Sequence, residues 1–410
     1  MTTSQFHSGQ ALSAETYQPI RAMFVHRWGA IMAGGELWLR ELIIQLRQQN
    51  VAISVALSID GPLYANLREM GVATHLTELE FLRATPRSAL LKSSVGLLHS
   101  ALRLWGLIIA TRTQIVHAFS AEAAEVAYLA TRLARAPLTV TVHNCGPFPR
   151  FDLMILRCCE QIIAISQAVA TDLQMAGIPA QRITLIPSGV TFASRDSGTA
   201  GALRQELGLA PTARIIGLIA TLESKKAQDV LIAAVPAILA RFPDAHILLI
   251  GAAHASSPGA PGRYEQQLRQ LASDLRVAEH VHFLGYRPAA ATFIHQFDVA
   301  VLCSRKEALG LAAIEALAAG APLVATAVEG LKEVVADGNT GLLVPPDDPS
   351  ALAAAIIRLL ADRALGAQLA ARGSQAVRER YDAARLAERH CRLYSDLLAR
   401  SQTFVSGGTI

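Results

Sequence analysis

The sequence has few cysteines, few aromatic residues and little charge for its length. Its five cysteines are an odd number without paired C-x-x-C motifs, which favours neither a disulfide framework nor a structural zinc site and indicates a reducing compartment. Only 17% of the 410 residues are charged and 52% are hydrophobic, which excludes a disordered chain. The formal net charge of +4 suits an anionic small ligand, a membrane surface or nucleic acid equally, so it excludes none of them.

The sequence also lacks a secretion signal and a long apolar run. Its first residues have no basic segment followed by an apolar one, so we expect a disordered lead-in over residues 1–20 and a cytoplasmic protein. The most apolar stretch, 95–110, contains His99 and Arg103. A membrane span needs about 20 mainly apolar residues, so no transmembrane helix is expected.

Short strand-like runs alternate with longer helix-period runs along the chain. This alternation predicts parallel sheets, and the apolar character of the strands predicts helices on both faces. The pattern pauses at the polar, glycine-containing stretch 191–202 and then restarts. We therefore predict an α/β protein whose two Rossmann-like domains, residues 1–190 and 191–380, face each other across a cleft. A C-terminal helix within 381–410 returns to the first domain.

The segment 304–326 follows an apolar strand and has the order loop, glycine, helix, glycine, strand. Gly310 opens the helix, so the amides of Gly310, Leu311 and Ala312 have no partners within it, and Leu309 belongs to the same turn. These amides and the helix dipole predict an anion site that suits a diphosphate.

Two glutamates flank this turn. Glu307 precedes the helix, and Glu315 lies about 7.5 Å inside it at about 1.5 Å per residue. A carboxylate accepts the two hydrogen bonds that a vicinal diol of a ribose or hexose donates, so the pair predicts a nucleotide-sugar pocket. Glutamates spaced eight apart also occur by chance. The Ala, Ile and Leu around Glu315 favour the ligand interpretation, because an unpaired charge there would be costly.

Four stretches together resemble the donor-binding signature of glycosyltransferase family 4: Glu307–Glu315, Gly320–Pro322, Glu329–Glu333 and Gly338–Val344. Other matches extend from about residue 21 to 400. The resemblance implies the GT-B fold and a retaining transferase of the hexosyltransferase type that uses a nucleotide sugar and no cofactor.

The resemblance also implies individual roles. Glu307 contacts the transferred sugar, Glu315 the ribose, and the backbone of Gly310 and Leu311 the diphosphate. The run 220–229 resembles the family's phosphate motif and keeps its cation as Lys226, although Thr221 stands where an arginine is usual.

The sequence has no D-x-D motif, because Asp347 and Asp348 are adjacent, so a metal-bridged diphosphate is unsupported. Lys226 and the helix dipole then have to stabilise the leaving group.

In the first half, Gly34 and Gly35 resemble the family's glycine-rich turn, although a Gly-Gly pair alone is more often an ordinary turn. His117 and His143 fall at strand ends, where we expect them to face the cleft, His117 as a catalytic residue and His143 on the acceptor side. Packing or hydrogen-bonded structure explains each histidine equally well.

Residues 81–113 are basic and amphipathic and contain no acid. They predict either an interfacial helix on a membrane or a core helix with a solvated basic face. The expected donor is a UDP-, GDP- or ADP-sugar, the acceptor a glycan, lipid-linked or small molecule, and nucleic acid is not expected. The alternatives are a nucleotide-sugar epimerase or a sugar phosphorylase, and a catalytically silent nucleotide-sugar-binding protein.

Overall fold

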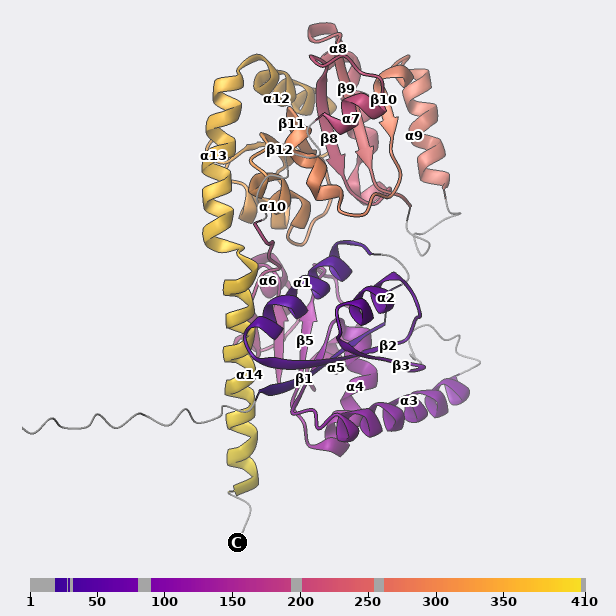
Figure 1. Cartoon of the computed structure of the whole chain (residues 1–410), viewed down its shortest axis with the longest axis vertical. Helices are drawn as coiled ribbons and strands as arrows, with labels where there is room; N and C mark the ends of the chain where they lie inside the picture. Colours follow the sequence, from indigo (N-terminus) through magenta and orange to yellow (C-terminus); the bar gives the residue numbers. More distant parts are fainter. Residues whose placement is uncertain are drawn as a thin grey trace, which may run out of the picture.

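The computed structural model describes residues 19–27, 29, 32–79, 90–192, 201–253 and 262–406, with no side-chain description for 90–94 and 402–406. The described residues form two α/β halves, and two long helices run along one side of both (Figure 1). The expectations for residues 1–18 and for 81–89 fall outside the described residues.

The first half contains a parallel seven-stranded sheet in the order β3-β2-β1-β4-β5-β6-β7. Its strands are β1 (Ile20–His26), β2 (Val51–Leu57), β3 (Ala73–Leu76), β4 (Ile115–Ala118), β5 (Leu138–Val142), β6 (Gln161–Ala164) and β7 (Ile183–Leu185). Its helices are α1 (Gly34–Gln48), α2 (Pro62–Glu69), α3 (Leu90–Ala110), α4 (Ala121–Ala134), α5 (Arg150–Leu156) and α6 (Gln167–Met175). From β1 the strands β2 and β3 are added on one side and β4 to β7 on the other. Doubly wound folds bind ligands at the point between β1 and β4 where this order switches.

The second half contains a parallel six-stranded sheet in the order β10-β9-β8-β11-β12-β13. Its strands are β8 (Arg214–Ile219), β9 (Ala245–Ile250), β10 (Val281–Phe283), β11 (Val299–Leu302), β12 (Leu323–Thr326) and β13 (Leu342–Val344). Its helices are α7 (Ala202–Glu206), α8 (Gln228–Arg241), α9 (Arg263–Asp274), α10 (Leu311–Ala318), α11 (Glu329–Val334), α12 (Pro349–Ala361) and α13 (Arg363–Arg380). The prediction of two Rossmann-like parallel sheets is confirmed.

The interior of both sheets is apolar because helices cover both faces. Every residue of β4, β5 and β6 is buried, and so is every residue of β11 and β12. Apolar runs without alternation are typical of such doubly covered strands.

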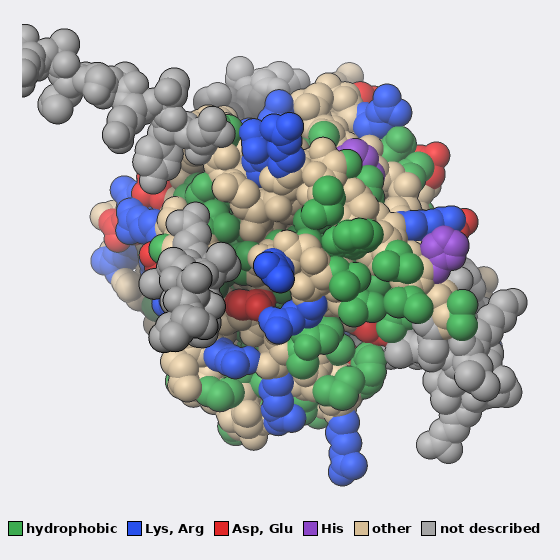
Figure 2. All heavy atoms as spheres, turned by 90° about the horizontal axis from the view of Figure 1, so that it is seen from below, with side chains coloured by type: hydrophobic (Ala, Val, Ile, Leu, Met, Phe, Trp, Pro, Cys, Tyr) green, Lys and Arg blue, Asp and Glu red, His purple; other side chains and the backbone are tan. Residues whose placement is uncertain are grey.

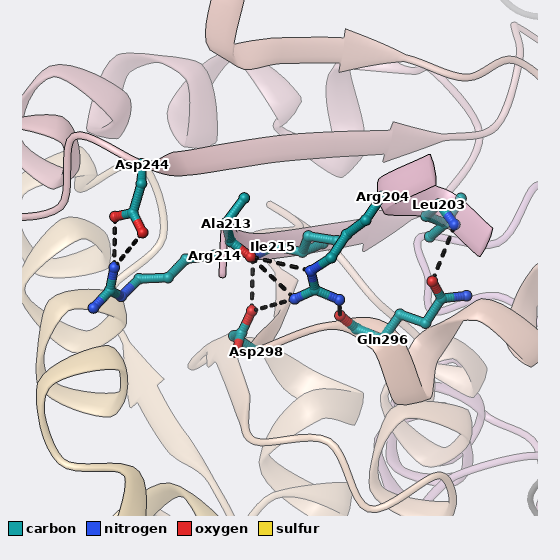
Figure 3. Close-up of polar contacts among 8 residues, drawn as sticks. All are labelled: Leu203, Arg204, Ala213, Arg214, Ile215, Asp244, Gln296 and Asp298. Carbon is teal, nitrogen blue, oxygen red and sulfur yellow. Dashed lines mark hydrogen bonds and ion pairs between the residues drawn. The ribbon is translucent and has the colours of Figure 1, made fainter. Parts of the chain in front are cut away.

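A polar network fixes the start of the second sheet (Figure 3). Arg204 of α7 donates hydrogen bonds to the Ala213 carbonyl at 3.0 Å and to Asp298 at 3.1 Å. Asp298 also accepts from the Ile215 amide at 2.8 Å, and this amide belongs to β8. The network therefore joins α7 to the amino ends of β8 and β11, at the edge of the sheet away from the carboxyl ends.

The chain crosses between the halves at two adjacent places. α13 packs on the second half, and α14 (Ala383–Ser406) continues onto the first, where it contacts α1 (Figure 1). Val190 exchanges backbone hydrogen bonds with Tyr381 and Ala383 at 2.9 and 3.1 Å. A Cβ at Gly189 would lie 2.8 Å from the Tyr381 carbonyl oxygen, so glycine permits this close crossing.

Candidate active site

A cleft of about 1140 Å³ lies between the two halves, at the carboxyl ends of the strands of both sheets. Residues from both walls line it, among them Gly34, Gly35, His143, Thr221, Lys226, Glu307, Leu309, Gly310, Leu311 and Glu315. With the exception of His117, the structure brings all the predicted site residues to this cleft.

Gly310 shapes the turn that opens α10. Its φ of 91° lies in the left-handed region, and a Cβ there would lie 2.5 Å from the Leu331 side chain, so both strain and space require glycine. The amide of Ala313 bonds back to the Gly310 carbonyl at 2.9 Å, whereas Leu311 and Ala312 lie in the first turn and line the cleft. Their amides offer an anion site at the positive end of the helix. The Leu309 side chain is buried, so it supports the turn from the core.

Helix α11 supports the same turn from behind. The Gly330 amide donates to the Glu307 carbonyl at 2.9 Å, and a Cβ on Gly330 would lie 2.4 Å from the Ala308 carbonyl. Only the second position of the Glu329-Gly330 pair is therefore sterically restricted to glycine.

Glu307 and Lys226 form an ion pair in the cleft. Lys226 Nζ lies 2.5 Å from Glu307 Oε2, and the Ser304 hydroxyl donates to the same oxygen at 3.2 Å. Both charged side chains are mostly buried, at 20% and 15% exposure. Lys226 can therefore bind an anion in the cleft only in competition with Glu307.

The turn that carries Lys226 is held by the loop that carries Glu307. The Arg305 amide donates to the Lys225 carbonyl at 2.8 Å. The Cys303 thiol donates to the Ala227 carbonyl at 3.0 Å. Ala227 has a left-handed φ of 54°, a conformation that glycine adopts more readily than alanine.

The Arg305 side chain extends this support. It donates to the Ser224 carbonyl at 2.5 Å and to Asp229 at 2.6 and 3.0 Å, and it also binds Asp347 at 2.6 Å. The sequence analysis missed this residue because an arginine in a loop resembles any solvated cation. Its only signal is its position between Ser304 and Glu307, directly after β11.

Glu315 lines the cleft from one turn inside α10. No described residue donates a hydrogen bond to its carboxylate, and burial raises its pKa to about 7. Its oxygens are therefore available to accept hydrogen bonds from a ligand in the cleft.

The first turn of α1 faces the first turn of α10 across the cleft. A Cβ on Gly34 would lie 3.8 Å from the Leu311 side chain, and Gly35 has free space around it. Glu36 accepts from the Ala33 amide at 3.2 Å and lies 3.2 Å from His26 Nε2. Two helix amino termini thus converge on one region, which is favourable for a diphosphate.

His143 lies in the first wall and lines the cleft. Burial lowers its pKa to about 4, so the ring is neutral at pH 7. Its Nε2 is buried with no hydrogen-bond partner among the described residues. His143 is therefore available to a ligand in the cleft, and its acceptor-side role stays a prediction.

His117 does not face the cleft, so the expectation for this residue is corrected. Its side chain is fully buried, with Nδ1 2.6 Å from the Tyr394 hydroxyl and Nε2 2.7 Å from the Thr141 hydroxyl. Tyr394 belongs to α14, which covers this part of the first sheet. Because both ring nitrogens are engaged, His117 fastens α14 to the first half.

Two contacts join the walls beside the cleft. Glu333 of α11 accepts hydrogen bonds from the Gln167 and Ala168 amides at the start of α6, at 2.8 and 2.7 Å. Lys306, next to Glu307, donates to the Gly146 carbonyl of the first half. Among the described residues, no group of three or more His, Cys, Asp or Glu side chains is placed to hold a metal ion.

Two Rossmann-type sheets whose carboxyl ends face one cleft define the GT-B class of proteins. Solved structures share this architecture. The HepE protein of Anabaena in complex with UDP-glucose is 23% identical, with a TM-score of 0.78 over 92% of this chain and 100% of that one. Sucrose-phosphate synthase from Thermosynechococcus elongatus is 22% identical, with a TM-score of 0.75 over 93% and 100%. The GT-B fold is thereby confirmed.

Sequence comparison identifies the family. Residues 32–193 match the model of Glycosyltransferase Family 4, and residues 200–380 match that of Glycosyl transferases group 1. The phosphatidyl-myo-inositol mannosyltransferase of Mycobacterium leprae is 30% identical over 306 residues, 72% of this chain and 76% of that one. The D-inositol 3-phosphate glycosyltransferase of Corynebacterium urealyticum is 33% identical over 222 residues, 50% of this chain and 51% of that one. The chain belongs to glycosyltransferase family 4.

Proposed function

We propose that the protein transfers a sugar from a nucleoside-diphosphate sugar to an acceptor hydroxyl in this cleft, with retention of configuration and without a metal ion. The observation that carries the proposal is the α10 turn, where Glu307, Lys226 and Glu315 surround the free amides of Leu311 and Ala312. One region therefore offers a cation and amides for a diphosphate and carboxylates for two diols.

In the proposed reaction the diphosphate lies at the facing amino termini of α10 and α1. It forms an ion pair with Lys226 that replaces the pair between Lys226 and Glu307. Glu315 binds the ribose, and Glu307 contacts the transferred sugar. The bond from the anomeric carbon to the diphosphate oxygen breaks, and its electron pair stays on that oxygen, where Lys226 and the helix dipole stabilise the charge. The acceptor oxygen bonds to the anomeric carbon on the same face, and its proton passes to the leaving phosphate.

Product analysis tests this proposal. The protein is incubated with UDP-, GDP- and ADP-sugars and candidate acceptors with excess chelator, and the anomeric configuration of the product is read by NMR. We expect a product with the configuration of the donor and an unchanged rate in chelator. An inverted product, or loss of activity that Mn²⁺ restores, would contradict it.

The acceptor side favours contact with an anionic membrane through α3. Five apolar side chains on this helix, spaced three or four residues apart, are between 39% and 68% exposed: Val95, Leu98, Leu102, Trp105 and Ile109. The alternate residues Ala101, Leu104 and Ile108 are buried. Among the described residues, no side chain covers the apolar outer face of α3. The charged residues of the segment 81–113 are all basic.

The neighbouring surface has the same character. Leu129 and Leu133 of α4, which packs against α3, are 37% and 49% exposed. Seen from below, hydrophobic side chains gather beside lysines and arginines, with few acids (Figure 2). None of the helices in the described part of the chain combines the length and apolar character that crossing a bilayer requires. We propose that this face lies on the membrane surface and that the acceptor is a glycan or a lipid-linked molecule.

Vesicle sedimentation tests the membrane contact. The protein should sediment with phosphatidylglycerol vesicles at low salt and be released at high salt. Replacing Leu98, Leu102 and Ile109 together by serine should abolish sedimentation. Met175→Ser is the control, since Met175 is 75% exposed on α6, outside this face. Equal sedimentation of the triple variant, or none of the wild type, would overturn the assignment.

A further inference from the structure

Four lysine or arginine side chains in the described part of the chain line the cleft: Arg40, Lys225, Lys226 and Arg287. Three of them are paired with carboxylates. Lys225 lies 2.8 Å from Glu223, Lys226 is paired with Glu307, and Arg287 donates to Glu206. Arg40 has no carboxylate partner among the described residues.

Arg40 is nevertheless held in place. It lies on α1 in the first wall and is partly buried, and its Nε donates to Asn66 Oδ1 of α2 at 2.7 Å. That bond leaves both Nη atoms for a ligand and restrains the plane of the guanidinium group. A restrained pair of Nη donors matches two oxygens of a phosphate group.

The acids nearest to Arg40 along α1 have other partners. Glu36 binds the Ala33 amide and His26. Glu41 accepts from Gln45 at 2.9 Å and from the Thr191 hydroxyl. A bound anion would supply the counter-charge that the described residues do not give to Arg40.

The position of Arg40 separates it from the diphosphate turn. Gly34, which faces α10, precedes Arg40 by six residues, about 9 Å along the helix. Lys226 and the amides of α10 already provide for the donor's phosphates from the opposite wall.

We propose that Arg40, held by Asn66, binds a phosphate group carried by the acceptor, so that this cleft takes phosphorylated acceptors. The proposal rests on the transferase function proposed above and adds the chemical class of its second substrate. Because a phosphate could also come from the donor, the test has to separate the two sources.

The test uses calorimetry with two probes. Glycerol 3-phosphate represents a phosphorylated acceptor, glycerol is its uncharged control, and UDP, GDP and ADP represent the donor. In wild type with its preferred nucleoside diphosphate present, glycerol 3-phosphate should bind and glycerol should not. Arg40→Met should weaken the affinity for glycerol 3-phosphate at least tenfold and leave the affinity for the nucleoside diphosphate within twofold of wild type.

Two further variants separate binding from folding. Arg40→Lys keeps the charge without the paired donors, so it should bind glycerol 3-phosphate less tightly than wild type and more tightly than Arg40→Met. Arg68→Met is the control, since Arg68 is an exposed arginine of α2 whose guanidinium group contacts Tyr64 of the same helix. It should match wild type, and all variants should unfold at similar temperatures.

Two results would overturn the proposal. In one, Arg40→Met weakens the nucleoside diphosphate and spares glycerol 3-phosphate, which assigns Arg40 to the donor. In the other, wild type does not bind glycerol 3-phosphate with or without nucleotide. Failure of wild type to bind any of the three nucleoside diphosphates would instead contradict the transferase function. In that case the affinities of wild type and Arg40→Met for glycerol 3-phosphate alone would still test the role of Arg40.

Discussion

The two walls of the cleft differ in how their polar groups are satisfied. In the second half, Lys226 is paired with Glu307, and Arg305 with Asp229 and Asp347. In the first half, Arg40 has no carboxylate partner among the described residues, and His143 lines the cleft with a buried Nε2 that has no described partner. The cations of the second half, which we call the donor wall, are therefore paired before any ligand arrives. The first half, which we call the acceptor wall, has polar groups that a ligand can satisfy, and so does Glu315 on the donor wall.

The largest effect should come from the donor wall. Glu307→Gln removes the charge that faces the transferred sugar, where positive charge grows as the bond to the diphosphate breaks. We expect kcat to fall by roughly 10²–10³, similar to the loss of one preorganised electrostatic contact. Steady-state kinetics with saturating donor measure it. A kcat within threefold of wild type would remove Glu307 from the reaction.

In the interior of the first half, away from the cleft, His117→Ala should affect stability and leave the donor site intact. The variant loses buried packing and leaves the Tyr394 and Thr141 hydroxyls without their partner, so unfolding should become easier by about 3 kcal/mol. Denaturant titration measures this change. Tyr394→Phe, which removes only the hydroxyl, should cost about 1 kcal/mol. If His117→Ala had wild-type stability but no turnover, His117 would instead take part in the reaction.

Lys226→Ala should weaken nucleoside diphosphate binding by about 1.5–3 kcal/mol, because a charge-assisted hydrogen bond is lost. Calorimetry measures it, with Lys225→Ala as the matched control on the same turn, since Lys225 is more exposed and paired with Glu223. Equal losses in the two variants would mean that the turn supplies general positive potential and no specific contact.

The smallest effect concerns pH. Burial raises the pKa of Glu315 to about 7, so its neutral form accumulates below pH 7 in the free protein. A ribose diol binds the ionised form, hence affinity for an intact nucleotide sugar should rise with pH and be on the order of tenfold tighter at pH 8 than at pH 6. Calorimetry at the two values measures this, and Glu315→Gln should abolish the dependence. The same slope in the variant would assign it to another group.

The fold followed from the sequence because strands covered on both faces need uninterrupted apolar runs, which are visible as such. The grouping of Glu307, Lys226 and Glu315 in one cleft could be predicted for a related reason. These residues lie within two short segments, 220–229 and 304–326, so their spacing carries the chemistry.

The environments of residues in the first half could not be predicted from the sequence, because the residues that contact one another there are distant along the chain. The environment of His117 depends on Tyr394, which is 277 residues away. The role proposed for Arg40 depends on its hydrogen bond to Asn66 of another helix and on the lack of a carboxylate partner among the described residues. Burial and the absence of a partner are properties of packing that no local pattern records.

The central claim is that the cleft binds a nucleotide sugar with its ribose on Glu315. Calorimetric titration of wild type and Glu315→Gln with UDP, GDP and ADP tests it most directly. We predict that one of the three binds wild type at a single site and that Glu315→Gln weakens binding of this ligand at least tenfold, while Glu307→Gln, which frees Lys226, does not weaken it. Binding of none of the three to wild type, or equal affinity in Glu315→Gln, would contradict the account.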